Sequence, residues 1–267
     1  MVVTGAASGM GNAAIRNLAE LGAEVLAADI GQIEDGPWTS IQVDIGSQAS
    51  IDSVIEVIGE PVHGLFNVAG VAGGRGKEKL AMMVNFFGLR HLTERLLPAM
   101  PKGGAIVNVS SLAGYRYLIA RAELEPMLAL ATMEDADRWL DLEETQEQFN
   151  GYGTSKELLN LWTVRSAKEF AEKHGVRINV VAPGSTETPL LDAFKANAIE
   201  RTGSDAVVTG SMGFMGRFAR AEDQAAACVF LGSDAAAMIT GQILTVDGGM
   251  AGAMSGGVLP EPGPRGR

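Results

Sequence analysis

A glycine-rich loop near the start of the chain restricts the fold more than any other feature of the sequence. The short apolar segment Val2–Thr4 is followed by Gly5, Gly9 and Gly11, and residues 12–21 then repeat Ala, Ile and Leu at helical spacing. In such a strand, loop and helix, small residues let backbone N–H groups at the positive end of the helix approach a pyrophosphate. A tight turn that binds nothing is the alternative for a loop of this type taken alone.

The alternation of strand and helix continues along the whole chain. Apolar segments ending in polar or glycine residues predict strands at 2–4, 24–28, 40–43, 63–66, 105–109, 177–181 and 243–246, with helical patterns between them. This order predicts an α/β protein with a single-domain Rossmann fold: a doubly wound, seven-stranded parallel sheet with helices on both faces. A length of 267 residues with 46% hydrophobic side chains suits one large core. The polar residues directly after the strands place the ligand site at the carboxyl edge of the sheet.

Two segments interrupt this alternation within an expected catalytic domain of residues 1–254. Residues 115–150 are acidic and predict a helical insertion, which either lines the pocket or covers an oligomer face. Residues 189–220 predict a substrate lid, where apolar side chains suit either a mobile cover or packing at an interface. The apolar residues in question are Met212, Phe214, Met215 and Phe218. The Gly- and Pro-rich tail 255–267 is expected to be extended or disordered.

Charge and composition exclude several classes of partner. The net charge of -11 and the lack of a Lys/Arg cluster argue against nucleic acid and membrane surfaces. No uncharged apolar run has membrane-spanning length and the first residues do not form a signal peptide, so a cytoplasmic protein is expected. The single cysteine, Cys228, lies in an apolar stretch and is expected in the core. No metal site is predicted, because His63, His91 and His174 lack metal-ligand spacing.

Two further features concern charged side chains near the expected ligand site. Lys156 follows Tyr152 by one helical turn, and its positive charge would favour the phenolate that a proton-transferring tyrosine needs. Taken alone, this spacing also fits an ordinary pair on a helix surface. Asp29 closes the second strand, where a carboxylate can bind the adenosine ribose and repel the extra phosphate of NADP. No Arg or Lys occupies residues 6–8 or directly follows Asp29, which favours NAD.

Read together, the motifs resemble the ordered series of the short-chain dehydrogenases/reductases. The series runs from Thr-Gly-x-x-x-Gly-x-Gly at residues 4–11 through Asn67-Val68-Ala69-Gly70, Asn85, Ser111, Tyr152-Gly-Thr-Ser-Lys156 and Pro183-Gly184. The resemblance covers essentially the whole chain. It implies a Rossmann-type fold, hydride transfer with NAD(P), and a homodimer or homotetramer.

The resemblance also implies roles for individual residues. Tyr152 would be the catalytic acid/base, Lys156 would support it and contact the nicotinamide ribose, and Ser111 would bind the substrate oxygen, with Ser110 the alternative as a simple strand-end cap. Asn85 would position a water in the proton relay; its alternative is a buried structural amide. The implied cofactor-binding residues are Gly5, Ser8, Gly9, Met10 and Gly11 in the glycine loop; Asp29; Asp44 and Ile45 at the adenine; Asn67, Ala69 and Gly70 on the adenosine side; Tyr152 and Lys156; and Pro183, Gly184, Thr186 and Thr188, the last at the carboxamide.

The expected substrate class comes from a feature in which this sequence differs from the usual pattern of the family. The interval from Ser111 to Tyr152 is longer than is usual in the family, and together with residues 84–94 and 184–191 it resembles a branch acting on coniferyl-type alcohols and 3α-hydroxysteroids. This implies a hydrophobic, aromatic alcohol or its carbonyl compound as substrate. A steroid or terpene alcohol is the main alternative, because the same catalytic residues serve many pockets. A non-catalytic NAD-binding regulator is the alternative from another class.

Overall fold

The computed structural model describes residues 1–58, 61–142, 151–209 and 212–260. Seven parallel strands form one sheet in the order β3-β2-β1-β4-β5-β6-β9, and β1 pairs with both β2 and β4, where the winding reverses. The strands are β1 (Val2–Thr4), β2 (Leu26–Asp29), β3 (Thr39–Gln42), β4 (Gly64–Asn67), β5 (Ala105–Val109), β6 (Arg177–Pro183) and β9 (Ile243–Val246). The predicted doubly wound parallel sheet is confirmed.

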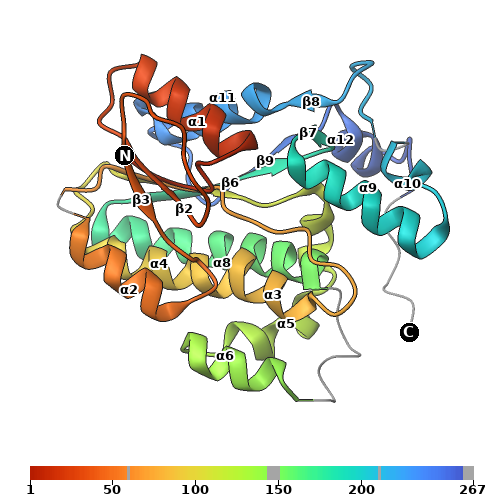
Figure 1. Cartoon of the computed structure of the whole chain (residues 1–267), viewed down its shortest axis with the longest axis horizontal. Helices are drawn as coiled ribbons and strands as arrows, with labels where there is room; N and C mark the ends of the chain where they lie inside the picture. The colour runs from red at the N-terminus through yellow and green to blue at the C-terminus, as the bar shows by residue number, and fades with distance from the viewer. Residues whose placement is uncertain (59–60, 143–150, 210–211, 261–267) are drawn as a thin grey trace.

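Helices cover both faces of this sheet, as Figure 1 shows. On one face α1 packs against α11, and small buried residues such as Ala13 and Ala14 allow a close approach. Cys228 lies in this layer with 1% of its surface exposed, as expected from the sequence. The other face carries a larger core under α2, α4 and α8. The bounds are α1 (Gly9–Glu20), α11 (Ala221–Gly232), α2 (Gln48–Val57), α4 (Leu89–Leu96) and α8 (Gly151–His174).

A π-helical turn, η1 (Met83–Gly88), joins α3 (Glu78–Met82) to α4. All six of its residues are buried. A Cβ atom on Gly88 would lie 1.8 Å from the carbonyl oxygen of Ile45, so only glycine lets the helix pass the loop after β3 this closely. Turns of this kind are rare and occur frequently at functional sites. The sequence analysis did not predict it, although it named Asn85 within it.

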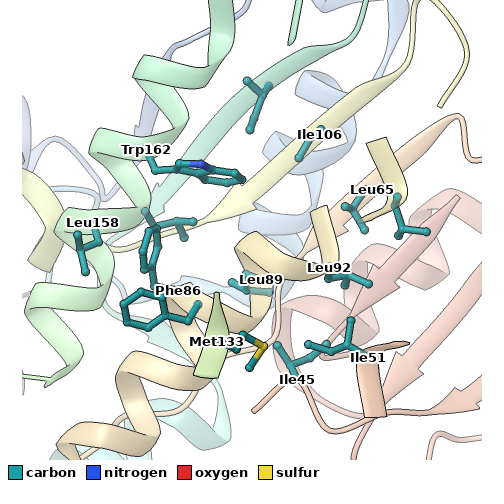
Figure 2. Packing of buried hydrophobic residues seen from close by; sticks show 14 of the residues in the cluster. Ile45, Ile51, Leu65, Phe86, Leu89, Leu92, Ile106, Met133, Leu158 and Trp162 are labelled. Atoms are coloured by element: carbon teal, nitrogen blue, oxygen red, sulfur yellow. The ribbon is translucent and has the colours of Figure 1, made fainter. Parts of the chain in front are cut away.

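The segment predicted as a helical insertion is packed into the core. It follows the 3-10 helix η3 (Leu112–Leu118) and contains α5 (Arg121–Leu128) and α6 (Met133–Leu140), while residues 143–150 lie outside the described residues. Figure 2 shows Met133 of α6 beside Phe86 and Leu89 in the main core. The side chains of α5 and α6 that are buried in this way include Leu124, Met127, Met133 and Leu140. Burying each of these side chains stabilises the folded state by about 1.5–3 kcal/mol relative to leaving it exposed.

The second segment that interrupts the alternation, residues 189–220, forms one end of the molecule and is not packed into the core in this way. Strands β7 (Thr186–Glu187) and β8 (Ala219–Arg220) form a separate two-stranded parallel sheet, with α9 (Pro189–Thr202) and α10 (Ala206–Thr209) between them. In Figure 1 these helices lie beside α12 (Met250–Ser255). The remaining short elements are η2 (Leu97–Ala99) and η4 (Asp234–Ala236).

The tail begins later than the sequence suggested. Ser255 ends α12, and the next residues turn back on the helix, since the N–H groups of Val258 and Leu259 both donate to the carbonyl of Ala253. These hydrogen bonds correct the expectation of an extended or disordered segment from Ser255 onward. Residues 261–267 lie outside the described residues. In the described part of the chain, no helix combines the length and apolar content that crossing a membrane requires.

Candidate active site

A pocket of about 970 Å³ opens at the carboxyl edge of the sheet, where the sequence analysis expected the ligand site. Its polar wall comes from the ends of β5 and β6 and from the first turn of α8, and includes Ser110, Ser111, Tyr152, Lys156, Pro183 and Gly184. The rest of the lining is largely apolar, with Leu112, Leu190, Leu191, Phe194, Ala198, Val207, Val208 and Met254, and it also includes the charged residues Arg75, Glu78, Glu200 and Arg201. The pocket therefore combines a few convergent polar groups with an apolar enclosure, which is the usual form of a small-molecule site.

Tyr152, Ser111 and Lys156 converge on one side of this pocket. The hydroxyl of Tyr152 shares a hydrogen bond with the side chain of Ser111. The Nζ atom of Lys156 lies 5.8 Å from the centroid of the Tyr152 ring and donates to the carbonyl of Val109 at 2.9 Å. Helical spacing places both side chains on the same face of α8, as expected. The arrangement can bind an oxygen atom and exchange a proton with it.

Burial shifts the pKa values of both Tyr152 and Lys156. It raises the pKa of Tyr152 to about 12, against an opposing effect of the Ser111 hydrogen bond. It also lowers the pKa of Lys156 to about 7. Both shifts have one cause, because a desolvated site disfavours the charged form of each group. Ionising Tyr152 near neutral pH therefore requires additional positive charge in the pocket.

The two serines after β5 have different positions. Ser110 is buried and its hydroxyl donates to the carbonyl of Lys156 at 3.1 Å, which fixes the end of β5 against α8. Ser111 caps η3 by accepting from the N–H of Ala113 at 3.1 Å and also bonds to Tyr152. The predicted substrate-binding serine thus faces Tyr152, the predicted acid/base, although it caps a helix as well.

Asn85 is fully buried behind the pocket wall. Its Oδ1 accepts from the N–H of Val71 at 2.8 Å, and its Nδ2 donates to the carbonyl of Val71 at 3.0 Å and to the hydroxyl of Ser155 at 3.2 Å. The amide therefore has structural partners on both sides, and it connects the loop after β4 to α8.

The glycine loop lies at the same edge of the sheet. Gly5 and Gly9 have φ angles of 73° and 53°, a left-handed region that favours glycine. Ser8 caps α1 with its backbone only and makes no side-chain capping bond, so the amides of the first turn remain accessible to an anion. The hydroxyl of Thr4 accepts from the amides of Val68 and Ala69, both at 3.1 Å, which joins this loop to the one after β4.

Carboxylates expected at the adenosine end are held by backbone amides. Asp29 accepts from the N–H groups of Ala7 at 2.9 Å and Gly31 at 2.8 Å, and Asp44 accepts from that of Gly46 at 2.8 Å. The second loop also contains Ile45, which is buried. These bonds orient the carboxylates while leaving further lone pairs for ribose hydroxyl groups.

The other predicted cofactor residues divide into two groups. Met10, Gly70, Pro183, Gly184, Thr186 and Thr188 line the pocket. Asn67 does not, because its side chain points into the sheet interior and donates to Thr93 and Asn108, both at 2.8 Å. Asn67 was a candidate because it is a polar side chain at the end of a strand. In the structure its amide takes part in a buried hydrogen-bond network instead.

The apolar residues that the sequence suggested for the lid are not those that line the pocket. Met212, Phe214 and Met215 are exposed, and neither they nor Phe218 belong to the described lining of the pocket. The reason is that this segment turns outward along the loop after β9, where the N–H of Phe214 donates to the carbonyl of Gly248. The pocket wall comes from the inner face of α9, which the sequence analysis did not single out. Leu190 or Leu191, Phe194 and Ala198 recur at helical spacing, and that pattern was the available signal.

Three further residues at the site were missed. The ring of Phe194 packs edge-on against that of Tyr152, with 4.7 Å between centroids. Ser155 bonds to Asn85, as described above. Gln224 is fully buried in α11 and donates to the hydroxyl of Thr186 at 3.1 Å, which holds β7 against the sheet. Ser155 and Gln224 depend on contacts distant in sequence, so no local pattern indicated them, whereas the helical spacing of Phe194 was an available signal.

Comparison with known proteins agrees with this geometry. A family model described as short chain dehydrogenase matches residues 1–122, and one described as Enoyl-(Acyl carrier protein) reductase matches residues 140–251. Coniferyl-alcohol dehydrogenase of Pseudomonas sp. (strain HR199 / DSM 7063) is 34% identical over 94% of this chain and 96% of that protein. The 3-alpha-hydroxysteroid dehydrogenase/carbonyl reductase of Comamonas testosteroni is 31% identical over 95% and 97%. The crystal structure of 3-alpha-hydroxysteroid dehydrogenase from Pseudomonas sp. B-0831, complexed with NADH, has a TM-score of 0.79 at 31% identity and covers 96% and 98%.

The doubly wound sheet with a glycine loop after β1 defines a Rossmann-type α/β protein. The relatives, similar over nearly their full length, specify it further: the chain belongs to the short-chain dehydrogenase/reductase family of oxidoreductases. The family and enzyme class predicted from the ordered motifs are therefore confirmed.

Proposed function

We propose that this oxidoreductase is an NAD-dependent dehydrogenase that interconverts a hydrophobic, aromatic alcohol and its carbonyl compound. The observation that carries the proposal is the convergence of Tyr152, Ser111 and Lys156 on one wall of an apolar pocket. These groups supply an acid/base, a hydrogen-bonding partner for the reacting oxygen, and a positive charge.

The residues of the cofactor edge fit a dinucleotide without a 2′-phosphate. The uncapped first turn of α1 suits a pyrophosphate, and the oriented carboxylate of Asp29 suits ribose hydroxyl groups while repelling a phosphate. A structural relative at 31% identity is described in complex with NADH. Changing Asp29 to Ala should weaken NAD binding and improve the relative use of NADP. An unaltered preference for NAD in steady-state assays would contradict this assignment.

In the proposed mechanism, NAD would supply the hydride acceptor when it is bound, and its oxidised ring would carry a positive charge. Ser111 holds the substrate oxygen by a hydrogen bond, and Tyr152 takes the hydroxyl proton during oxidation and returns it during reduction. Protonated Lys156 stabilises the phenolate of Tyr152 and contacts the nicotinamide ribose. Asn85 fixes the loop that carries Gly70 against the catalytic helix. The pH dependence follows, because oxidation needs ionised Tyr152 together with protonated Lys156: its rate should rise with pH and fall again where Lys156 loses its proton.

The substrate class follows from the pocket wall. Its side chains are largely apolar, and Phe194 places an aromatic ring directly beside Tyr152, the residue proposed to exchange the proton of the alcohol. An aromatic substrate ring can pack against it in the offset or edge-on geometry that such rings prefer. The relative with 34% identity is named for coniferyl alcohol, which has such a ring.

A 3α-hydroxysteroid or terpene alcohol is the second candidate. The apolar side chains of α9 suit a bulky ring system, and two relatives are named as 3-alpha-hydroxysteroid dehydrogenases. These alcohols present the same reacting group to Tyr152 and Ser111, so only the apolar wall distinguishes them from aromatic alcohols.

The test is formation of NADH by the purified protein with cinnamyl-type, steroid, terpene and simple aliphatic alcohols. We expect activity on the cinnamyl-type class, and the Tyr152→Phe variant should lose turnover while it still binds NAD, because only the proton-transferring hydroxyl is removed. Activity on steroids alone would favour the second candidate. Measurable NAD binding with no turnover across the panel, and a Tyr152→Phe variant that retains biological activity, would favour a regulator over an enzyme.

The assembly proposed for the protein is a homodimer or homotetramer in the cytoplasm. The resemblance to the family supports it, and exposed apolar side chains such as Phe214, Met215 and Met238 offer contact area. Sedimentation equilibrium measures the assembly directly, and a monomer at micromolar concentration would contradict it.

A further inference from the structure

Ser155 lies between the two functional residues of α8, yet it is fully buried and does not belong to the described lining of the pocket. Its hydroxyl donates to the carbonyl of Tyr152 at 2.7 Å and accepts from the Nδ2 atom of Asn85 at 3.2 Å. The first bond is a local one that serine often makes in helices. The second joins the first turn of the catalytic helix to the π-helical turn on another element.

The network continues from Asn85 to the loop after β4. Both polar atoms of the Asn85 amide bond to the backbone of Val71, which directly follows the pocket residue Gly70. A Cβ atom on Gly70 would lie 3.2 Å from the Oδ1 of Asn85 and 3.6 Å from the Nζ of Lys156, so this loop lies very close to both side chains. A chain of hydrogen bonds therefore runs from the Gly70 loop through Asn85 and Ser155 to the backbone of Tyr152.

This network has little freedom to rearrange. The Asn85 amide makes three hydrogen bonds, and rotating it would break at least one of them inside the protein, where an unpaired polar group is costly. The Ser155 hydroxyl uses its single hydrogen on the Tyr152 carbonyl, so it meets Asn85 as an acceptor only. Each partner thus determines the orientation of the next.

We infer that Ser155 is a positioning residue for hydride transfer: through Asn85 it fixes the turn of α8 that carries Tyr152 relative to the Gly70 loop. The inference rests on the proposed function, since Gly70, expected on the adenosine side from the sequence, lies instead beside Lys156, the residue proposed to contact the nicotinamide ribose. Misplacing a reacting group by about 1 Å can cost up to about 100-fold in rate, because reaction requires a close and aligned approach. Binding of cofactor and alcohol depends less on that alignment.

The test replaces Ser155 by Ala and compares the variant with Thr154→Val. Thr154 is the neighbouring residue on α8 and fully buried, and its Oγ1 has no hydrogen-bond partner among the described residues. Thr154→Val therefore removes a buried hydroxyl from the same helix without removing a hydrogen bond. We expect Ser155→Ala to slow hydride transfer about tenfold in single-turnover formation of NADH, with the Kd of NAD and the KM of the alcohol within about twofold of the parent protein. Thr154→Val should transfer hydride at the parental rate.

A double-mutant cycle tests whether Ser155 acts through Asn85. If it does, Ser155→Ala should add little to the loss caused by Asn85→Ala, so the rates of the double variant and of Asn85→Ala should agree within about twofold. Losses that multiply would overturn the proposed route. If Asn85→Ala does not fold, the comparison of Ser155→Ala with Thr154→Val decides alone.

Other outcomes separate this inference from the proposed function. A Ser155→Ala variant with a lower Tm and the parental rate of hydride transfer would show a purely structural role and overturn the inference. If Tyr152→Phe loses turnover while Ser155→Ala keeps it, only the positioning role is wrong. If Tyr152→Phe keeps turnover, the proposed acid/base is wrong and the positioning role fails with it.

Discussion

The two segments that interrupt the alternation of strands and helices differ in how they are attached. In residues 115–142, Ala120, Leu124, Ala136 and Leu140 are almost completely buried in the main core. In α9 only Leu191 and Ala198 are buried, and the described residues of α10 include none. In Figure 1 the first segment lies under the sheet and its helices, whereas α9 and α10 extend along one end of the molecule.

This difference shows that the longer interruption mainly stabilises the fold, while the lid segment shapes the pocket. No described residue of 115–142 lines the pocket, but seven residues of α9 and several neighbours do so along one helix face. The sequence analysis left open whether the insertion lines the pocket or covers an oligomer face. Its described part packs on η1 and α8 and therefore belongs to the core.

Replacing Arg90 with Met should weaken the packing of the insertion on the core. We expect it to give the largest loss of stability among these predictions. The buried guanidinium of Arg90 donates to the carbonyls of Leu128 and Leu130 at the end of α5, and lies over the rings of Phe86 and Phe87. Removing it leaves two part-buried carbonyls without their donor and a gap in the core, at a cost of about 2–4 kcal/mol, or a Tm lower by about 5–10 °C. The KM of the alcohol below the transition should stay within about twofold, because the pocket is unchanged.

Thermal denaturation followed by circular dichroism measures this effect. Arg95→Met is the matched control, since Arg95 lies on the same helix but is half-exposed and pairs with Asp52 at the surface. Parental melting of Arg90→Met would mean that the insertion does not depend on this residue.

Replacing Phe194 with Leu should alter specificity and leave stability nearly unchanged. The ratio of kcat/KM for cinnamyl alcohol to that for its cyclohexyl analogue should fall about 2- to 10-fold relative to the parent protein, because only the aromatic substrate loses a ring contact. Comparing ratios cancels the intrinsic reactivity of the two alcohols. Phe214→Leu is the control, as Phe214 is exposed and outside the described lining. An unchanged ratio would remove Phe194 from the determinants of specificity.

The smallest expected effect comes from Glu125→Gln on the surface of the insertion. Hydrogen bonds from Arg165 hold the pKa of Glu125 at about 2, below its ordinary value of 4.5. A lowered carboxyl pKa stabilises the folded state above pH 4.5, and this contribution is lost as the pH falls from 4.5 towards 2. The parent protein should therefore melt slightly above the variant at pH 7, and the difference should vanish near pH 2. A pH-independent difference would exclude this ion pair as its cause.

The sequence predicted the fold and the pocket residues that depend on short-range patterns. All seven strands of the main sheet occur within two residues of their expected bounds, because apolar runs and the turns after them are local signals. Tyr152 and Lys156 lie together because one helical turn separates them. By contrast, the π-helical turn around Asn85 and the buried amide network of Asn67 depend on partners far away in the chain, such as Val71 and Asn108.

The close contact at Gly88 has a consequence for protein engineering. The loop that holds Asp44 and Ile45 abuts this glycine, three residues beyond Asn85, so substitutions that reshape the proposed adenine site would be transmitted through Asn85 to α8. Asp29 has no such mechanical link, since its carboxylate bonds only to two nearby loop amides among the described residues. The proposed role of Asp29 in cofactor preference can therefore be tested by a change of charge at the end of β2 that leaves the geometry around Tyr152 intact.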